Sequence, residues 1–167
     1  MTLQEFNRLS REEQRRLLFT CCGSNSWVDM MVGLFPFADR DVLLKAASEQ
    51  WRQCGAEDWL EAFRHHPKIG DIASLEKKFA STAALAGGEQ SSVRHATPDT
   101  LHALAAANAE YEDRFGFIFI VCATGKSAAE MLALLQARLN NSPQMELKQA
   151  MLEQEKITAL RLQKIIS

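Results

Sequence analysis

The sequence lacks an excess of charge of either sign. Its 19 Lys and Arg residues stand against 21 Asp and Glu residues, which leaves a formal net charge of -2 at pH 7. Proteins that bind the phosphate backbone of DNA or RNA usually concentrate positive charge on one surface. We therefore expect no nucleic acid partner.

A long hydrophobic run is also missing. The apolar run near the middle of the chain, residues 115–125, carries no charged side chain, but it is shorter than the roughly 20 residues that cross a bilayer. The first residues show no basic region followed by an apolar stretch, and the last three, Ile165, Ile166 and Ser167, differ from the Ser-Lys-Leu address of peroxisomal proteins. These features predict no membrane association and a cytoplasmic location.

Cysteine is scarce, and its spacing excludes two architectures. The four residues Cys21, Cys22, Cys54 and Cys122 contain no C-x-x-C pair, so neither a disulfide framework nor a zinc knuckle fits. We expect reduced, mostly buried thiols. A thiol redox protein would need an exposed cysteine with a low pKa, and the position of Cys122 within the most apolar run argues against that class.

The sequence does contain enough apolar material for one core. Of its 167 residues, 47% are hydrophobic and 24% charged, as in ordinary globular proteins, and the length predicts a single domain over residues 1–167. Three capping boxes and two hydroxyl-proline pairs predict five helix starts. They are Thr2-x-x-Glu5, Ser10-x-x-Glu13, Ser127-x-x-Glu130, Thr97-Pro98 and Ser142-Pro143.

Apolar residues recur at helical spacing and predict helices with one buried face. The sets are Trp27, Met30, Met31 and Leu34; Leu101, Leu104, Ala105, Asn108, Tyr111 and Phe115; Met131, Leu132, Leu135 and Leu139; and Ala150, Met151, Ile157 and Leu160. Further helices are expected over residues 41–51 and 57–65. Residues 117–122 look strand-like, but a lone strand would leave its backbone unpaired, so we interpret them as a helix end passing into a buried connection. The expected fold is an all-α, single-domain bundle of about eight to ten helices.

The sequence contains no complete motif for a common cofactor or metal. Gly125-Lys126-Ser127 matches the end of a phosphate-binding loop, but that loop needs a glycine where Ile120 stands. Adjacent histidines such as His65 and His66 rarely face one metal ion, and no H-E-x-x-H motif is present. We expect no metal and no organic cofactor.

Three polar clusters are candidates for chemistry. In residues 65–71 two imidazoles precede a rigid proline, and an imidazole can exchange a proton near neutral pH; on local grounds a surface turn with a capping histidine is the commoner explanation. Glu89 and Gln90 follow two glycines and either begin a solvated helix or orient a polar ligand. Arg161 lies between two leucines, which is typical of a surface arginine whose stem lies on the core.

Five motifs occur in order along nearly the whole chain. They are His65-His66-Pro67-Lys68-Ile69-Gly70-Asp71, Glu89-Gln90, Tyr111-x-x-Arg114-Phe115-Gly116-Phe117-Ile118-Phe119, Ala137-Arg138-Leu139-Asn140, and Lys156-Ile157 with Leu160-Arg161-Leu162. This ordered series resembles the 2-oxo-4-hydroxy-4-carboxy-5-ureidoimidazoline (OHCU) decarboxylase family. Trp27, Pro36 and Phe37 also stand in family-like places.

The resemblance implies an all-helical, cofactor-free carboxy-lyase of purine breakdown. Such an enzyme converts the unstable small-molecule product of urate oxidation and 5-hydroxyisourate hydrolysis to (S)-allantoin. By the resemblance His66 and Glu89 are catalytic, while Pro67, Gln90 and Arg161 contact the substrate. A further segment meets the ligand largely through its backbone; it consists of Phe119, Ile120, Val121, Cys122 and Ala123.

Three positions depart from the family pattern. Ala86 stands where the family has a serine, so Ser81, Thr82 or water would have to supply that hydroxyl. Ile118 replaces a common proline, and Thr124 replaces an arginine often found after the buried segment, which leaves Lys126 as its substitute.

The alternative from another class is a non-enzymatic helical interaction module in which His66 and Glu89 are ordinary turn residues. The two differ in convergence, because an enzyme must bring His66, Glu89, Gln90 and Arg161 into one pocket, whereas a binding module exposes an apolar patch. The sequence does not fix the oligomeric state, and a homodimer is among the states it allows.

Overall fold

The computed structural model describes residues 1–67, 73, 75, 77 and 97–167. Within them the chain forms eight α-helices and no strand, which confirms the predicted all-α class. The helices are α1 (Leu3–Arg8), α2 (Arg11–Cys21), α3 (Asn25–Val32), α4 (Arg40–Gln53), α5 (Ala56–Arg64), α8 (Pro98–Phe115), α9 (Ala128–Arg138) and α10 (Pro143–Ile165). The chain divides into two compact units, Met1–His66 with Gln149–Ser167, and Pro67–Lys148. A single domain over the whole chain stays a prediction.

The five predicted helix starts are all present. Thr2, Ser10 and Ser127 each accept the backbone N–H three residues on, and the Glu at that position reaches back to the N–H of the cap. Thr97 caps α8, and the Ser142 hydroxyl accepts an N–H of the first turn of α10 at 3.3 Å. The helices expected over residues 41–51 and 57–65 are α4 and α5.

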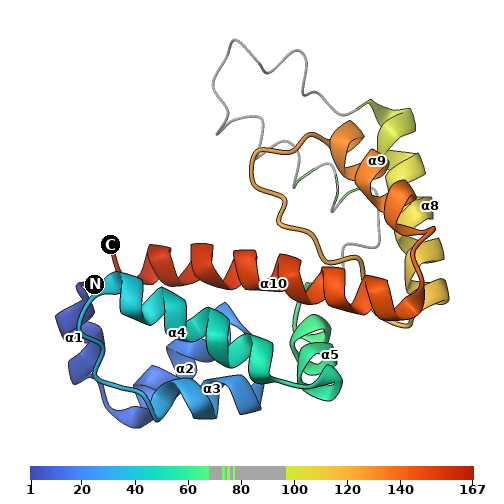
Figure 1. Cartoon of the computed structure of the whole chain (residues 1–167). Coiled ribbons are helices and arrows are strands. Elements are labelled where there is room, and N and C mark those ends of the chain that lie inside the picture. Colours follow the sequence, from blue (N-terminus) through green and yellow to red (C-terminus); the bar gives the residue numbers. More distant parts are fainter. Residues whose placement is uncertain (68–72, 74, 76, 78–96) are drawn as a thin grey trace. The chain divides into compact units, whose positions relative to one another are not determined.

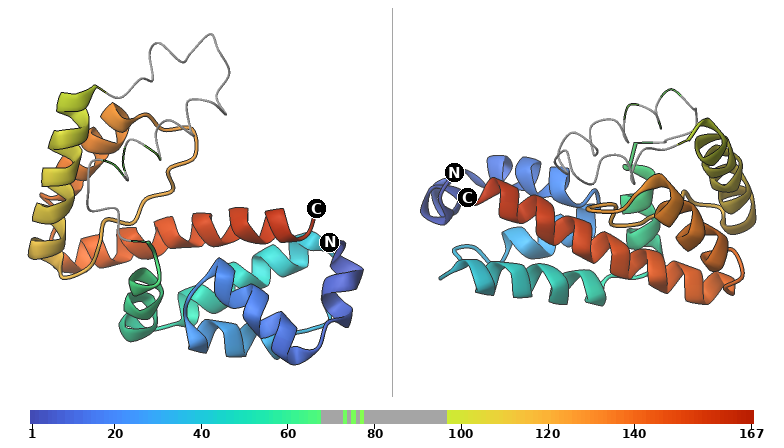
Figure 2. Two further views of the ribbon diagram at one scale, coloured as in Figure 1. Left: turned by 180° about the vertical axis from the view of Figure 1, so that it is seen from behind. Right: turned by 90° about the horizontal axis from the view of Figure 1, so that it is seen from above.

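The first unit is built around large aromatic side chains. Trp27 and Trp51 are at most 1% exposed, and each indole N–H has a carbonyl acceptor, since Trp27 donates to Ala47 at 3.0 Å and Trp51 to Met151 at 2.9 Å. The second of these bonds joins α4 to the middle of α10, and the two helices lie side by side in Figures 1 and 2. Buried indoles whose N–H groups are paired add apolar burial without an unsatisfied donor.

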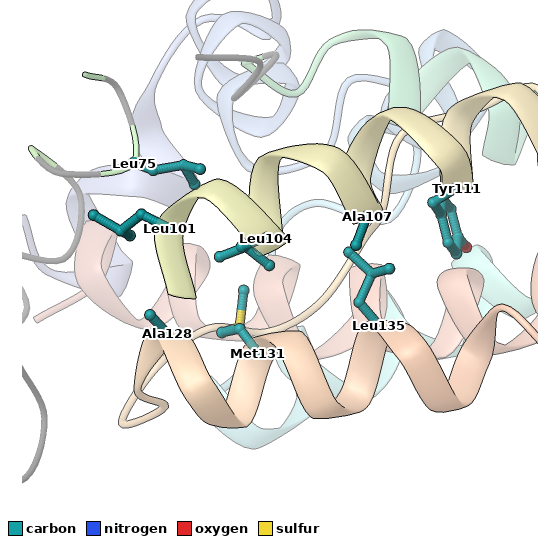
Figure 3. Close-up of a cluster of buried hydrophobic side chains, with 8 residues drawn as sticks. All are labelled: Leu75, Leu101, Leu104, Ala107, Tyr111, Ala128, Met131 and Leu135. Carbon is teal, nitrogen blue, oxygen red and sulfur yellow. The ribbon is translucent and has the colours of Figure 1, made fainter. Parts of the chain in front are cut away.

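In the second unit α8 packs along α9. Side chains of both helices, together with Leu75, form the apolar cluster shown in Figure 3, which consists of Leu75, Leu101, Leu104, Ala107, Tyr111, Ala128, Met131 and Leu135. This packing confirms the helical stripes that the sequence predicted for both helices. No helix in the described ranges is both long and apolar enough to cross a membrane.

The strand-like run is a connection without regular structure. Helix α8 ends at Phe115, because Gly116 takes up the left-handed conformation (φ 79°) that terminates a helix. The helix end therefore comes earlier than we expected, and residues 117–123 lie wholly in the connection to α9. Ile120 is buried and its neighbours in this run are half-buried, as the sequence predicted for a buried connection.

Candidate active site

The two adjacent histidines follow α5 and have different surroundings. The ring of His65 packs edge-on against Phe19 at 4.9 Å between centroids. A Cβ at Gly23 would lie 2.6 Å from the Cβ of His65, so only glycine fits there. His66 turns instead to α10, where its Nε2 is hydrogen-bonded to the side-chain oxygen of Gln154. His65 thus packs as a structural residue, and His66 has a polar partner.

Gln154 belongs to a chain of polar contacts on the buried face of α10. Its side-chain N–H group donates to the Thr158 hydroxyl at 3.1 Å, and that hydroxyl donates to the carbonyl of Cys21 at 3.5 Å. Gln154 is 0% and Thr158 4% exposed. Sequence patterns singled out neither residue. The available signal was their position: every fourth residue from Ala150 to Leu162 lies on the buried face of the helix, and the two in between are polar.

Arg161 contacts the C-terminal end of α2. One guanidinium nitrogen lies 3.4 Å from the carbonyl of Thr20 and 3.3 Å from that of Cys21. The last carbonyls of a helix lack intrahelical partners and lie at the negative end of the helix dipole, so a cation there is stabilising. Arg161 is half-buried and acts at least as a cap for α2.

Several predicted site residues lie outside the described residues. They are Glu89 and Gln90, together with Ala86, Ser81 and Thr82. Their convergence with His66 and Arg161 therefore stays a prediction. Pro67 is described and is exposed, directly after His66.

In the second unit, three backbone carbonyls of residues 119–123 accept hydrogen bonds. The carbonyl of Ile120 accepts from Arg138 at 2.7 Å, and that of Cys122 from the Lys126 ammonium at 2.8 Å. The Ala123 carbonyl accepts the N–H of Lys126 at 3.0 Å. Within the described ranges, the N–H groups of residues 119–123 donate to no protein acceptor. This segment can offer donors to a ligand, and Lys126, which the resemblance names as a substitute for an arginine, lies beside it.

A buried ion pair holds this segment. Arg138, 8% exposed, donates to the carboxylate of Glu146, 0% exposed, at 2.6 Å. The Tyr111 hydroxyl donates to the same carboxylate, and the Arg138 guanidinium lies 4.5 Å from the centre of the Phe119 ring. Burial, together with the Glu146 contact, raises the pKa of Tyr111 well above its usual value, so the phenol stays a donor. Sequence reasoning named Arg138 only within a motif and missed Glu146.

The cysteines and the exposed apolar residues concern the two alternative classes, a thiol redox protein and a helical interaction module. All four cysteines are free thiols, and burial raises the pKa of Cys21 and Cys54 to about 11 and that of Cys22 to about 12, which keeps these three protonated at neutral pH. The large exposed hydrophobic residues of the described part come from five separate segments of the chain. They are Met1, Leu34, Val42, Leu134 and Met145.

The described residues contain no group of three or more His, Cys, Asp or Glu side chains that could hold a metal ion. Activity without a metal or organic cofactor stays a prediction, which a chelator can test.

Comparison with known proteins places the chain in context. The family model described as OHCU decarboxylase matches residues 7–163. A uric acid degradation bifunctional protein of Arabidopsis thaliana is 39% identical over 150 residues, which cover 88% of this chain and 45% of that protein. An OHCU decarboxylase of Haloferax volcanii is 27% identical over 163 residues and is matched over 94% of its length.

Solved structures agree with these relatives. A crystal structure of OHCU decarboxylase in the presence of (S)-allantoin superimposes with a TM-score of 0.74 at 35% identity, covering 94% of this chain and 98% of that one. Several curated relatives are larger proteins: this chain spans 45% of the Arabidopsis protein and 32% of a bifunctional relative from Bacillus sp. (strain TB-90).

Proposed function

The chain belongs to the OHCU decarboxylase family, and from that premise we propose that it decarboxylates OHCU to (S)-allantoin in urate degradation, without a cofactor. The observation that carries the proposal is the likeness, at 35% identity over 94% of the chain, to an OHCU decarboxylase crystallised in the presence of (S)-allantoin. The four free thiols support a reducing compartment, so we place the reaction in the cytoplasm.

The substrate provides its own electron sink. Its carboxylate stands next to a carbon bonded to a C=N group, so when that C–C bond breaks, CO2 leaves and the electron pair enters the ring. The pair then takes up one proton at the ureido-bearing carbon and becomes the new C–H bond. The protein has to hold the carboxylate, stabilise the enol-like intermediate and deliver the proton to one face.

We assign the delivery of that proton to His66, whose imidazole has a suitable pKa range for acid and base work. Glu89 binds the N–H groups of the ureido chain and ring, and the Gln90 side chain donates a hydrogen bond to a carbonyl of the substrate. Arg161 neutralises either the substrate or Glu89, and Pro67 lines the site. Support for His66 comes from its polar partner on α10, which His65 does not share.

Residues 119–123 contribute through their backbone. Their N–H groups lack acceptors in the described part of the chain, while three of their carbonyls are already bonded. N–H donors of this kind bind the carbonyl oxygens and the developing negative charge of the substrate better than they bind the N–H groups of the substrate.

The test is to add the purified chain to freshly generated OHCU and to follow optically active allantoin by circular dichroism. We expect a rate well above the spontaneous decay and a single enantiomer. Racemic allantoin formed at the spontaneous rate would remove the proposal. Sedimentation in the same buffer distinguishes a monomer from the homodimer that the sequence allows.

A further inference from the structure

Three residues on one face of α10 connect His66 to the end of α2. Gln154, Thr158 and Arg161 are spaced by four and three positions, which places them on neighbouring turns of the same helix face. Gln154 contacts His66, while Thr158 and Arg161 both reach the carbonyl of Cys21. The contacts from His66 to Cys21 form a continuous hydrogen-bonded chain.

This chain has a preferred direction. The Cys21 carbonyl can only accept, so the one proton of the Thr158 hydroxyl goes to it, and the hydroxyl accepts from the N–H group of Gln154. The amide oxygen of Gln154 then faces His66, and an oxygen of this kind can only accept. The Nε2 atom of His66 must therefore carry the proton of this bond.

Reversing the chain would cost a hydrogen bond. If the Gln154 amide turned round, Thr158 would have to donate to it, and the Cys21 carbonyl would lose the Thr158 proton. The Cys21 carbonyl would keep Arg161 as a donor at 3.3 Å, but Gln154 and Thr158, which are 0% and 4% exposed, would gain no new partner in exchange. The reversed chain would therefore hold one hydrogen bond fewer than the observed one.

We infer that Gln154 is a positioning residue that fixes the tautomer of His66, so that Nε2 keeps its proton and Nδ1 exchanges the proton used in catalysis. This inference rests on the proposed function for its catalytic part. In the transfer step the Nδ1–H bond of the imidazolium breaks, its electron pair stays on Nδ1, and the proton goes to the ureido-bearing carbon. The neutral ring that remains is the Nε2–H form, which Gln154 already binds.

The tautomer can be observed directly. Long-range ¹H–¹⁵N correlation spectra of the ¹⁵N-histidine-labelled protein, taken above the titration of His66, separate the Nε2–H and Nδ1–H forms of the neutral ring. The signal of His66 is assigned by its absence in His66→Ala. We expect the Nε2–H form in the wild type, and finding the Nδ1–H form there overturns the inference.

Variants at position 154 connect the tautomer to turnover. Gln154→Leu removes the acceptor at similar volume, and we expect a mixture of tautomers and a kcat lower by about tenfold with KM little changed. The magnitude is taken from partners that orient metal-bound imidazoles, whose removal costs about 10–100-fold. Gln154→Glu keeps an oxygen facing His66, so it should restore the Nε2–H form and part of the rate. The matched control is Gln163→Leu, the same change on the exposed side of α10.

The outcomes separate this inference from the proposed function. An active wild type with an unchanged kcat in Gln154→Leu refutes the role of Gln154 and leaves the decarboxylase assignment standing. A wild type without activity refutes the assignment, while the spectra still decide the tautomer. Near-ultraviolet circular dichroism identifies a variant that fails to fold, in which case Gln154→Glu provides the comparison.

Discussion

The buried pair of Arg138 and Glu146 offers the sharpest prediction for stability. Glu146→Leu removes the carboxylate at similar volume and leaves a guanidinium, 8% exposed, without its counter-charge. Breaking one partner of a buried pair costs about 3–5 kcal/mol. For a protein of this size each kcal/mol lowers the melting temperature by about 2–4 °C, so we expect a drop of roughly 6–20 °C.

Thermal unfolding followed by circular dichroism measures this drop, and two further variants make the result specific. Arg138→Met combined with Glu146→Leu removes both charges and should recover much of the loss, because paired apolar replacements of buried ions are often neutral or stabilising. Glu49→Leu breaks the exposed pair with Lys45 (3.8 Å) and should change stability by less than about 1 kcal/mol. A Glu146→Leu protein that melts within about 2 °C of the wild type would refute the reasoning.

Three further predictions concern the site, acid stability and cofactor use. Arg161→Ala should lower both turnover and melting temperature, because the guanidinium caps α2, whereas Glu89→Gln should lower turnover alone; unchanged rates in both would exclude these residues from the site. Burial raises the pKa of Glu155, but hydrogen bonds from Arg52 and Ser48 outweigh it and leave the pKa below its usual value. The unfolded chain therefore binds more protons than the folded one. This contribution to stability is lost as the pH falls below about 4.5. Urea midpoints at neutral and acid pH should therefore differ less in Glu155→Gln than in the wild type. Dialysis against a chelator should leave the decarboxylation rate unchanged, and a lost rate that zinc restores would contradict cofactor independence.

Local signals in the sequence were sufficient for the helices. A Ser or Thr cap with a Glu three residues on, or with a following proline, depends only on neighbours in the chain, so the starts of α1, α2, α8, α9 and α10 could all be predicted. The end of α8 was harder to predict, because the left-handed Gly116 competes with an apolar pattern that continues through Phe119.

Long-range polar pairing could not be predicted in the same way. Gln154 and Thr158 occupy buried positions of α10 where the periodicity indicates apolar residues, and their partners lie 88 and 137 positions away in the chain. Sequence patterns describe which face of a helix is buried, but they do not say which distant carbonyl or imidazole a polar residue on that face will meet. Glu146 was missed for the same reason, since Tyr111, one of its partners, lies 35 positions away.

The central claim, that this chain decarboxylates OHCU with His66 as its acid, is tested most directly by one comparison. Wild type, His66→Ala and His65→Ala are added to freshly generated OHCU, and optically active allantoin is followed with the fold of each checked by circular dichroism. We predict rapid formation by the wild type, a loss of at least roughly 10²-fold in His66→Ala, and near-normal turnover in His65→Ala. A folded His66→Ala protein with near-normal turnover, or equal damage in both variants, would contradict the account.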